Sequence, residues 1–383
     1  MDKRGRKNPL LLGASSFFND VGSNSINAII PFYITALGGG GIAIGLVSGL
    51  RDGISSFFNM LGGWLSDKIG KRKPLVFTGY LISDIFKFLL LIAGSWQQAV
   101  AFDSSSRIGK FRDAPRDAIL AKETENRGKK FGIQQTLDSA GAVIGTLLVL
   151  FLFWKLNFSF RTIILISSVI ALVSLITVSL VKDYRNKEEK KTSAKKGNIL
   201  GKDLKYFILV ASVFVFGNFG FYMFLELRAK EITGSIIIPL VLFVIYNIVY
   251  SAFPVPFGKL SDRIGRKRVL LIGYCLFFLI SLGLIFTSNI IYLGVIFALY
   301  GLVYAITDSN QRAFISDMSG SAKGTAFGIY YFATGITAII GGLIAGYLWN
   351  IDYSIMFTFT AVIALASIIL LLFMKEKLNA EKI

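Results

Sequence analysis

Long apolar segments recur along the whole chain, and they constrain its fold more than any other feature of the sequence. Clear examples run from Thr162 to Val181, Tyr206 to Leu225, Val269 to Phe286 and Ile355 to Met374. Each has roughly 18 residues or more, which lets a helix cross a bilayer core of ~30 Å. The chain has 383 residues, 54% of them hydrophobic, and a soluble domain of that size could not cover so much apolar surface in one core. The sequence therefore predicts an all-α membrane protein.

The distribution of basic residues predicts which loops are cytoplasmic. We expect twelve transmembrane helices, at residues 8–35, 42–65, 74–95, 97–119, 130–153, 159–181, 206–227, 235–257, 269–287, 290–315, 325–349 and 352–374. With these spans, 29 of the 41 Lys and Arg residues lie in the termini and in every second loop, whereas the other loops hold 3. Cytoplasmic loops carry an excess of Lys and Arg, so both termini are predicted to be cytoplasmic. The net charge of +18 then needs no nucleic-acid partner, because anionic lipid can balance it.

The predicted fourth helix, at 97–119, is too polar to be recognised by hydropathy. The alternative is a long outer loop. In that case Lys122 and the basic residues after it would lie outside, and every later helix would be inverted. The segment 182–205, which holds nine Lys and Arg residues, would then be external. A crossing at 97–119 restores the charge rule everywhere. Such a polar helix must face other helices or a water-filled cavity.

Two related halves make up the chain. The segment from Gly63 to Lys73 recurs 195 residues later as the segment from Gly258 to Arg268. Between the halves, residues 182–205 are rich in charge and poor in apolar residues, as in a linker. We therefore expect a six-helix bundle at 1–181, a cytoplasmic linker at 182–205 and a second six-helix bundle at 206–383.

The repeated loop follows predicted helices 2 and 8 and reads Gly-x-Leu-Ser-Asp-Lys/Arg-x-Gly-Arg/Lys-Arg/Lys. It resembles the signature loop of the major facilitator superfamily. The resemblance implies two six-helix bundles, related by a pseudo-two-fold axis around a central cavity, that rock to give alternating access. Arg107 stands where that family usually has an arginine in its fourth helix. Gly141 and Gly145 lack the proline of the drug–proton antiporter motif, which weakens a drug-antiporter assignment.

In this family, the acidic residue of the signature loop pairs with an arginine at the inner end of the fourth helix of its bundle. The resemblance and the repeat imply such pairs between Asp67 and Arg116 and between Asp262 and Arg312, each stabilising one access state. The alternative is that these charges only enforce topology. The glycines of the two loops, which we group with these pairs, are Gly63, Gly70, Gly258 and Gly265.

Charged residues inside the predicted helices are candidates for substrate or ion binding. Asp20 lies well inside the first helix beside Asn19, and an isolated carboxylate there costs ~2.5–3.5 kcal/mol or more. Asp103, Arg107 and Lys110 follow one face of the fourth helix. A pair between Asp20 and Arg107 would satisfy both groups, and substrate or proton binding could compete for it. The alternative is a static pair that holds the bundle together.

Other polar groups complete the candidate set. Asp138 in the fifth helix is a second carboxylate for proton uptake. The predicted seventh helix carries a polar stripe at i, i+4 and i+8, and the tenth helix carries polar and aromatic residues at helical spacing. Their candidates are Asn218, Tyr222, Glu226, Tyr304 and Asp308. Each tyrosine could equally serve in ordinary packing. The charges at Arg51 and Asp52, and at Asp84 and Lys87, could neutralise each other locally.

The composition excludes several kinds of chemistry. The chain has one cysteine, Cys275, and no histidine, so an intramolecular disulfide, a Cys-cluster metal site and a histidine proton relay are all excluded. No phosphate-binding loop pattern is present. We expect no cofactor, no metal site and no enzymatic activity.

The sequence therefore predicts a multi-pass protein of the plasma or inner membrane that acts as a secondary active transporter. We expect it to move a small molecule or ion by alternating access, as a monomer, coupled to protons or another ion. Antiport of drugs or cations and uptake of an organic anion both remain open, because the candidate residues carry both signs of charge. The non-transport alternative is a membrane receptor or lipid-handling protein on the same scaffold.

Overall fold

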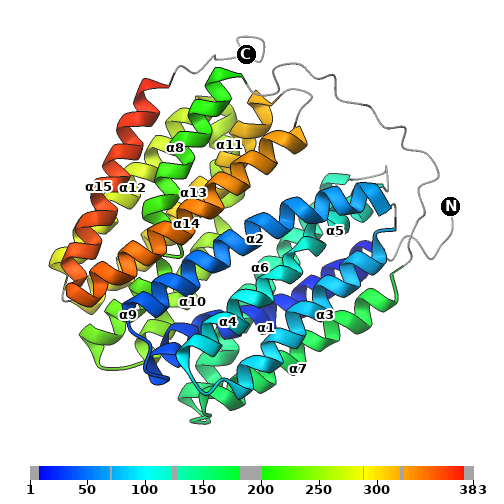
Figure 1. Ribbon diagram of the computed structural model, residues 1–383, viewed down its shortest axis with the longest axis horizontal. Helices are drawn as coiled ribbons and strands as arrows, with labels where there is room; N and C mark the ends of the chain where they lie inside the picture. Colours follow the sequence, from blue (N-terminus) through cyan, green and yellow to red (C-terminus); the bar gives the residue numbers. More distant parts are fainter. Residues whose placement is uncertain are drawn as a thin grey trace.

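The computed structural model describes residues 8–69, 71–122, 127–181, 201–287, 289–319 and 323–374, and their regular secondary structure is helical. The helices run roughly parallel in two groups that lie side by side (Figure 1). We call the end where α1 begins and α15 ends the near end, and the opposite end the far end.

The first group, α1–α7, forms six rods. Its helices are α1 (Asn8–Ala36), α2 (Gly41–Ile69), α3 (Lys73–Leu89) continued by η2 (Leu90–Ile92), α4 (Trp96–Ser106) continued by η3 (Arg107–Arg112) and α5 (Asp113–Lys122), α6 (Arg127–Trp154) and α7 (Phe160–Ser179). The predicted fourth helix is therefore confirmed as a continuous rod, α4–η3–α5, which extends from the far end to the near end beside α3.

The second group also forms six rods. Its helices are α8 (Lys202–Asn218) followed by α9 (Tyr222–Thr233), α10 (Ile237–Ala252) followed by α11 (Pro254–Ile264), α12 (Arg266–Phe286), α13 (Ile290–Met318), α14 (Lys323–Ile351) and α15 (Tyr353–Phe373). The twelve predicted helices are all present. Two breaks were not predicted, between α8 and α9 and, with a bend of 45°, between α10 and α11.

Apolarity alone would recognise only part of this set. Among the described residues, eight helices are long and apolar enough to span a membrane, or nine when α10 and α11 count as one bent span. The three remaining rods are α1, α2 and α4–η3–α5. These rods carry charged and polar side chains that face the other helices, which lowers their hydropathy without exposing the charges to lipid.

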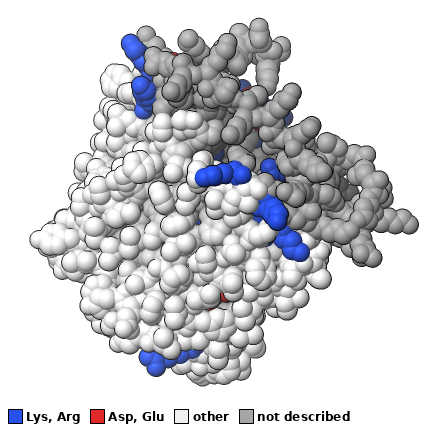
Figure 2. Space-filling view, turned by 45° about the vertical axis from the view of Figure 1, so that its right-hand side comes forward, with Lys and Arg blue, Asp and Glu red and all other residues white. Residues whose placement is uncertain are grey.

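Apolar side chains cover the outside of the bundle. Large aliphatic and aromatic residues such as Phe151, Ile176, Leu279 and Phe373 are each more than half exposed. The basic side chains visible in Figure 2 lie toward the upper and right-hand parts of this face and at its bottom, and the broad surface between them is almost entirely uncharged. An exposed apolar surface of this extent requires a lipid environment.

The two groups touch along two pairs of helices that a pseudo-two-fold axis would exchange. Helix α2 packs along α14, and α6 packs against α10. In the sequence repeat, α2 corresponds to α10–α11 and α6 corresponds to α14, so each contact is the counterpart of the other. The two halves therefore meet symmetrically around the space between them.

Glycines bring α2 and α14 into backbone contact. A Cβ atom added to Gly45 would lie 1.9 Å from the carbonyl oxygen of Gly342, and one added to Gly49 would lie 2.6 Å from that of Ala338. Small residues at intervals of about four let membrane helices approach this closely. The spacing of Gly41, Gly45, Gly49 and Gly53 is therefore a packing requirement at the far half of the interface.

We predict that Gly45→Ala destabilises the protein while Gly283→Ala does not. The added methyl group at Gly45 must displace the α14 backbone, whereas at Gly283 it meets only the Ile296 side chain at 3.8 Å. Overpacking of this kind costs ~1–3 kcal/mol. Thermal unfolding of both purified variants in detergent measures the difference, and equal midpoints would contradict the close contact.

Candidate functional site

A cavity of about 500 Å³ lies between the two halves. The first half contributes most of its charged lining, from α1, α3, α4–η3–α5 and α6. The second half contributes Asn247, Tyr250, Tyr304, Asp308 and Arg312 from α10 and α13. The predicted face of the fourth helix is confirmed, because Asp103, Arg107 and Lys110 all line this cavity.

The cavity is more exposed toward the near end. The side chain of Asp103, deep in the cavity, is 3% exposed, whereas those of Asp117 and Arg312 are 48% and 47% exposed. Chain direction places Asp117 and Arg312 nearer the near end, because both α5 and α13 run toward it. The site is therefore a deep pocket with a wet mouth at the near end.

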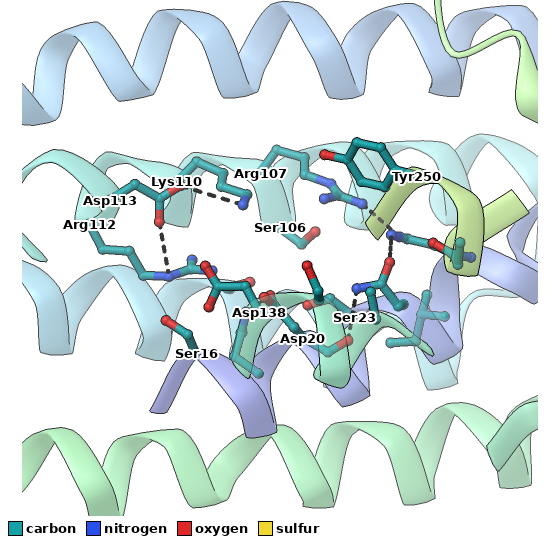
Figure 3. A pocket seen from close by; sticks show the side chains of 18 of the residues that line it. Ser16, Asp20, Ser23, Ser106, Arg107, Lys110, Arg112, Asp113, Asp138 and Tyr250 are labelled. Atoms are coloured by element: carbon teal, nitrogen blue, oxygen red, sulfur yellow. Dashed lines mark hydrogen bonds and ion pairs between the residues drawn. The ribbon is translucent and has the colours of Figure 1, made fainter. Parts of the chain in front are cut away.

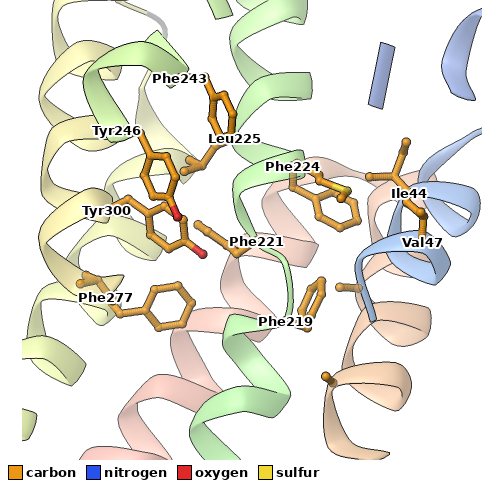
Figure 4. Close-up of a cluster of buried hydrophobic side chains, with 14 of the residues drawn as sticks. Ile44, Val47, Phe219, Phe221, Phe224, Leu225, Phe243, Tyr246, Phe277 and Tyr300 are labelled. Carbon is orange, nitrogen blue, oxygen red and sulfur yellow. The ribbon is translucent and has the colours of Figure 1, made fainter. Parts of the chain in front are cut away.

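Apolar packing closes the far end. Phe219, Phe221 and Phe224, at the break between α8 and α9, are fully buried together with Ile44 and Val47 of α2 (Figure 4). Gly220 makes this packing possible, because its φ is +29° and a Cβ there would lie 2.4 Å from the Cβ of Ser48. The backbone N–H of Gly220 also donates to Asp52 over 3.3 Å.

A buried ion pair lies on the far side of the cavity. Arg51 of α2 donates to both carboxylate oxygens of Asp103, from Nε over 2.5 Å and from Nη2 over 2.6 Å. Its Nη1 donates over 2.8 Å to the hydroxyl of Tyr222, in the other half. The predicted local neutralisation of Arg51 by Asp52 is therefore wrong, because Asp103 is the ion-pair partner of Arg51. The arrangement links α2, α4 and α9 across the interface.

The local pair in α3 is confirmed. Lys87 Nζ lies 3.0 Å from Asp84 Oδ1 and donates to Asn19 Oδ1 over 2.9 Å. All three side chains are buried. This cluster ties α3 to α1 and assigns the predicted candidate Asn19 to a structural contact at the cavity wall.

A network of charges surrounds the mouth. Lys110 lies 3.4 Å from Asp113, and Arg116 lies 3.1 Å from Asp117 and 4.0 Å from the predicted candidate Asp138. Gln134 of α6 donates to Asp138 over 2.8 Å, and Arg116 also donates to Ser16 of α1 over 2.8 Å. The network joins α1, η3–α5 and α6 around water-accessible carboxylates.

The predicted pair between Asp20 and Arg107 is wrong. Arg107 Nη2 donates to Asn27 Oδ1 over 2.7 Å, and the hydrogen bond that the Asp20 carboxylate accepts comes from its neighbour Asn19, over 3.3 Å. The pair does not form because Arg107 is drawn to Asn27, two turns beyond Asp20 on α1. Both side chains nevertheless line the cavity, as Figure 3 shows.

Aromatic side chains form the opposite wall. Tyr246 stacks on Tyr250 with ring centroids 6.1 Å apart, and Tyr250 meets Tyr304 edge to face at 5.8 Å. Tyr250 and Tyr304 line the cavity, so the prediction for Tyr304 is consistent with this position. Beside them, the carboxylate of Asp308 lies 2.6 Å from Arg312.

The break after α8 separates the predicted polar stripe of the seventh helix, so that prediction is wrong. Asn218 accepts a hydrogen bond from Tyr300 over 2.8 Å, whereas Tyr222 binds Arg51. Glu226 is fully buried, and neither of its carboxylate oxygens has a hydrogen-bond partner among the described residues. Of these three candidates, none lines the cavity.

Comparison with known proteins identifies this architecture. The family model of the Major Facilitator Superfamily matches residues 12–235 and 235–383. The chain belongs to the major facilitator superfamily. It is 44% identical over 382 residues to an uncharacterized MFS-type transporter of Methanocaldococcus jannaschii, covering 97% of this chain and 96% of that protein. The protein is therefore a carrier of small molecules and not an enzyme.

The more distant relatives include a multidrug resistance protein and a nucleoside transporter. Residues amounting to 34% of this chain align, at 33% identity, with 32% of the multidrug resistance protein MdtH of Photorhabdus laumondii. The crystal structure of a mutant of the nucleoside transporter NupG superposes with a TM-score of 0.83 at 14% identity, covering 96% of this chain and 100% of that one. The structural likeness supports the superfamily fold of two six-helix bundles.

The signature loops of the superfamily lie at the near end. Asp262 pairs with Arg266, at 2.5 Å, and Arg312 pairs with Asp308, so the predicted pair between Asp262 and Arg312 is wrong for this conformation. The side chain of Asp67 and residue Gly70 lie outside the described residues. Of the other predicted positions, Arg116 joins the mouth network, Gly63 approaches Ala114, Gly258 has open space around it, and Gly265 has a φ of +97°.

Sequence reasoning missed two residues of this superfamily cavity. Asn27 holds Arg107, and Ser16 holds Arg116. The signal available for Asn27 was its spacing, because Asp20, Asn24 and Asn27 lie on one face of α1 at i, i+4 and i+7. Ser16 precedes Asp20 by four residues, so it lies on the same face of α1 and could have been found by the same spacing.

We predict that Arg51→Met destabilises the protein strongly and that the double variant Arg51→Met/Asp103→Leu recovers much of the loss. Removing one partner of a buried pair leaves the other charge unpaired and costs ~3–5 kcal/mol, whereas an apolar pair of similar volume is often nearly neutral. Unfolding midpoints in detergent for wild type, both single variants and the double variant give the interaction energy between Arg51 and Asp103. A double variant whose loss of stability equals the sum of the two single losses would contradict the pairing.

Proposed function

We propose that the protein is a secondary active transporter that moves a small solute by alternating access, coupled to protons or another ion. The observation that supports this proposal is the cavity between the halves, sealed at the far end by apolar packing and by the Arg51–Asp103–Tyr222 contacts and open at the near end. A charged pocket of this kind, placed between two bundles, suits a site that is exposed to one side at a time.

We further propose that both termini are cytoplasmic, in the plasma or inner membrane. The excess of Lys and Arg at the near end supports this orientation. The described conformation is then inward-facing. The functional units would be the bundles at 1–181 and 206–383, joined by the linker at 182–205, and the carrier would act as a monomer.

Coupling is assigned to carboxylates that line the cavity. Asp138 lies beside Arg116, which Asp113 and Asp117 share, so a proton bound at Asp138 would redistribute the contacts of Arg116. Asp20 is the second candidate, as a carboxylate of α1 in the same cavity. Access from the near end lets either group exchange protons with water in this conformation.

Export of drugs is a second candidate function, supported by the partial likeness to a multidrug resistance protein. Balanced charge in the cavity, rather than an apolar pocket, favours a polar solute instead. The two functions differ in the solute that is transported: an apolar drug in the first case and a small polar solute in the second.

We predict that Tyr222→Phe shifts the conformational equilibrium toward opening at the far end. Its hydroxyl bonds Arg51 of the other half, whereas the hydroxyl of Tyr300 bonds Asn218 within the same half over 2.8 Å, so Tyr300→Phe is the matched control. Spin labels report the distance between the halves at each end, in a Cys275→Ser background. The labelled cysteines replace Lys155 and Tyr292 at the far end, or Ile69 and Lys259 at the near end.

Pulsed electron–electron double resonance should show the far-end distance between spin labels lengthening and the near-end distance shortening in Tyr222→Phe. Removing a hydrogen bond to a charged group is worth ~1.5–3 kcal/mol, enough for roughly a tenfold or larger change in population. Tyr300→Phe should leave both distances as in wild type. A single unchanged distribution at both ends under all conditions would contradict alternating access and favour a rigid receptor.

We predict that solute flux in proteoliposomes responds to an imposed pH gradient. A pH-sensitive dye inside the vesicles measures proton movement when a panel of amino acids, organic anions and cationic drugs is added. Asp138→Asn should uncouple protons from solute, whereas Asp203→Asn, at an exposed carboxylate in the first turn of α8, should not. Solute flux that is equal with and without the gradient would contradict proton coupling.

A further inference from the structure

The charged groups of the cavity wall are almost completely paired with each other. Six lining residues are cationic and six are anionic. Their ion pairs, some with partners behind the wall, are Arg51–Asp103 at 2.5 Å, Lys87–Asp84 at 3.0 Å, Lys110–Asp113 at 3.4 Å, Arg112–Asp113 at 3.8 Å, Arg116–Asp113 at 3.9 Å, Arg116–Asp117 at 3.1 Å, Arg116–Asp138 at 4.0 Å and Arg312–Asp308 at 2.6 Å. Within the described part of the chain, one lining cation and one lining anion remain without such a partner: Arg107 and Asp20.

Arg107 has hydrogen-bond donors to spare. Its Nη2 donates to the neutral amide oxygen of Asn27, and its buried Nε has no partner among the described residues. Its charged neighbour Arg51 is already bound to Asp103. A guanidinium that keeps a free donor edge in a protein cavity is suited to a planar anionic group such as a carboxylate.

Asp20 is the complementary anchor. Within the described residues, its carboxylate accepts one hydrogen bond, from Asn19 at 3.3 Å, and forms no ion pair. Its carboxylate therefore has free acceptor capacity on the cavity wall. An ammonium or other cationic group on a ligand would satisfy it.

The two anchors meet α1 at different heights, because Asp20 belongs to α1 and Arg107 of η3 binds Asn27 of the same helix. Asn24 Nδ2 donates to the Asp20 carbonyl oxygen over 3.0 Å, and Asn27 Nδ2 donates to Asn24 Oδ1 over 3.4 Å. Asn27 Oδ1 in turn accepts the hydrogen bond from Arg107. Seven residues of an α-helix rise ~10 Å, so Asn27, which binds Arg107, stands about that far from Asp20 along α1.

Two aromatic rings lie on the facing wall. Tyr250 and Tyr304 line the same cavity as Arg107, and the two rings meet edge to face. Rings that line a polar cavity offer a face for a planar apolar group. The cavity therefore presents a cationic anchor and an anionic anchor on one wall and two aromatic rings on the other.

We propose that the substrate is a compact organic zwitterion whose anionic group binds Arg107, whose cationic group binds Asp20, and whose planar apolar body lies against Tyr250 and Tyr304. A ligand with one charge would leave the other anchor uncompensated at low dielectric, whereas a zwitterion leaves the cavity neutral. This inference rests on the proposed transport function and names the substrate class of its cavity. It leaves Asp138 for the coupling proton.

Calorimetric binding to the purified full-length protein tests the inference without requiring transport. Two zwitterions with different charge spacing are compared with analogues that lack one charge: phenylalanine with phenethylamine and 3-phenylpropionate, and 4-(aminomethyl)benzoate with benzylamine and 4-methylbenzoate. In at least one set the zwitterion should bind about tenfold or more tightly than both analogues, the scale of one charged hydrogen bond.

Two variants assign the anchors. Asp20→Asn should lose the preference for the zwitterion over the anionic analogue, and Arg107→Gln should lose the preference over the cationic analogue. Asp203→Asn and Arg268→Gln, at exposed residues outside the cavity, are the matched controls and should bind as wild type. Equal affinity for a zwitterion and a singly charged analogue in both sets, or binding unaffected by both variants, would overturn the inference. Zwitterion binding without solute flux would instead contradict the proposed transport.

Discussion

The cost of holding charge in a membrane determines the arrangement of this protein. A charge at the bilayer centre costs several kcal/mol unless it is paired or wet. The chain meets this condition by turning its polar rods, α1, α2 and α4–η3–α5, toward other helices and by pairing Arg51 with Asp103 and Lys87 with Asp84. The cavity follows from the same constraint, because charges that are only partly paired need water. Its position between the halves makes this water accessible from one end at a time in the proposed cycle.

Broken helices and glycines give the interface its form. The break around Gly220 lets Phe219 and Phe221 pack at the far end while Tyr222 reaches Arg51. A continuous helix would have kept Asn218, Tyr222 and Glu226 on one face. The 3-10 segment Arg107–Arg112 similarly changes the direction of the side chains that follow Asp103. These local departures decide which charges meet.

The fold could be predicted from the sequence, whereas the partners of individual side chains could not. Apolar periodicity, the charge of loops and the repeat at Gly63 and Gly258 are sufficient for twelve helices in two halves, because lipid imposes the same rule on every span. Membership of one helix face correctly placed Asp103 and Arg107 in a cavity. The partner of Arg107 depended on how α1 and η3 are rotated about their axes, which the sequence does not specify, so Asn27 was missed and the pair with Asp20 was wrong.

The contact between α2 and α14 has a consequence for how the halves could move. Its surface at Gly45 and Gly342 consists of backbone atoms, which have no rotamers to reorganise. Sliding or rolling such surfaces past each other orders and releases no side chains, so it avoids an entropic cost that reaches ~1.5–2 kcal/mol for a long side chain. The barrier between access states would then come mainly from the few polar contacts across the interface, and ligand binding energy acting on those contacts would control the rate of exchange.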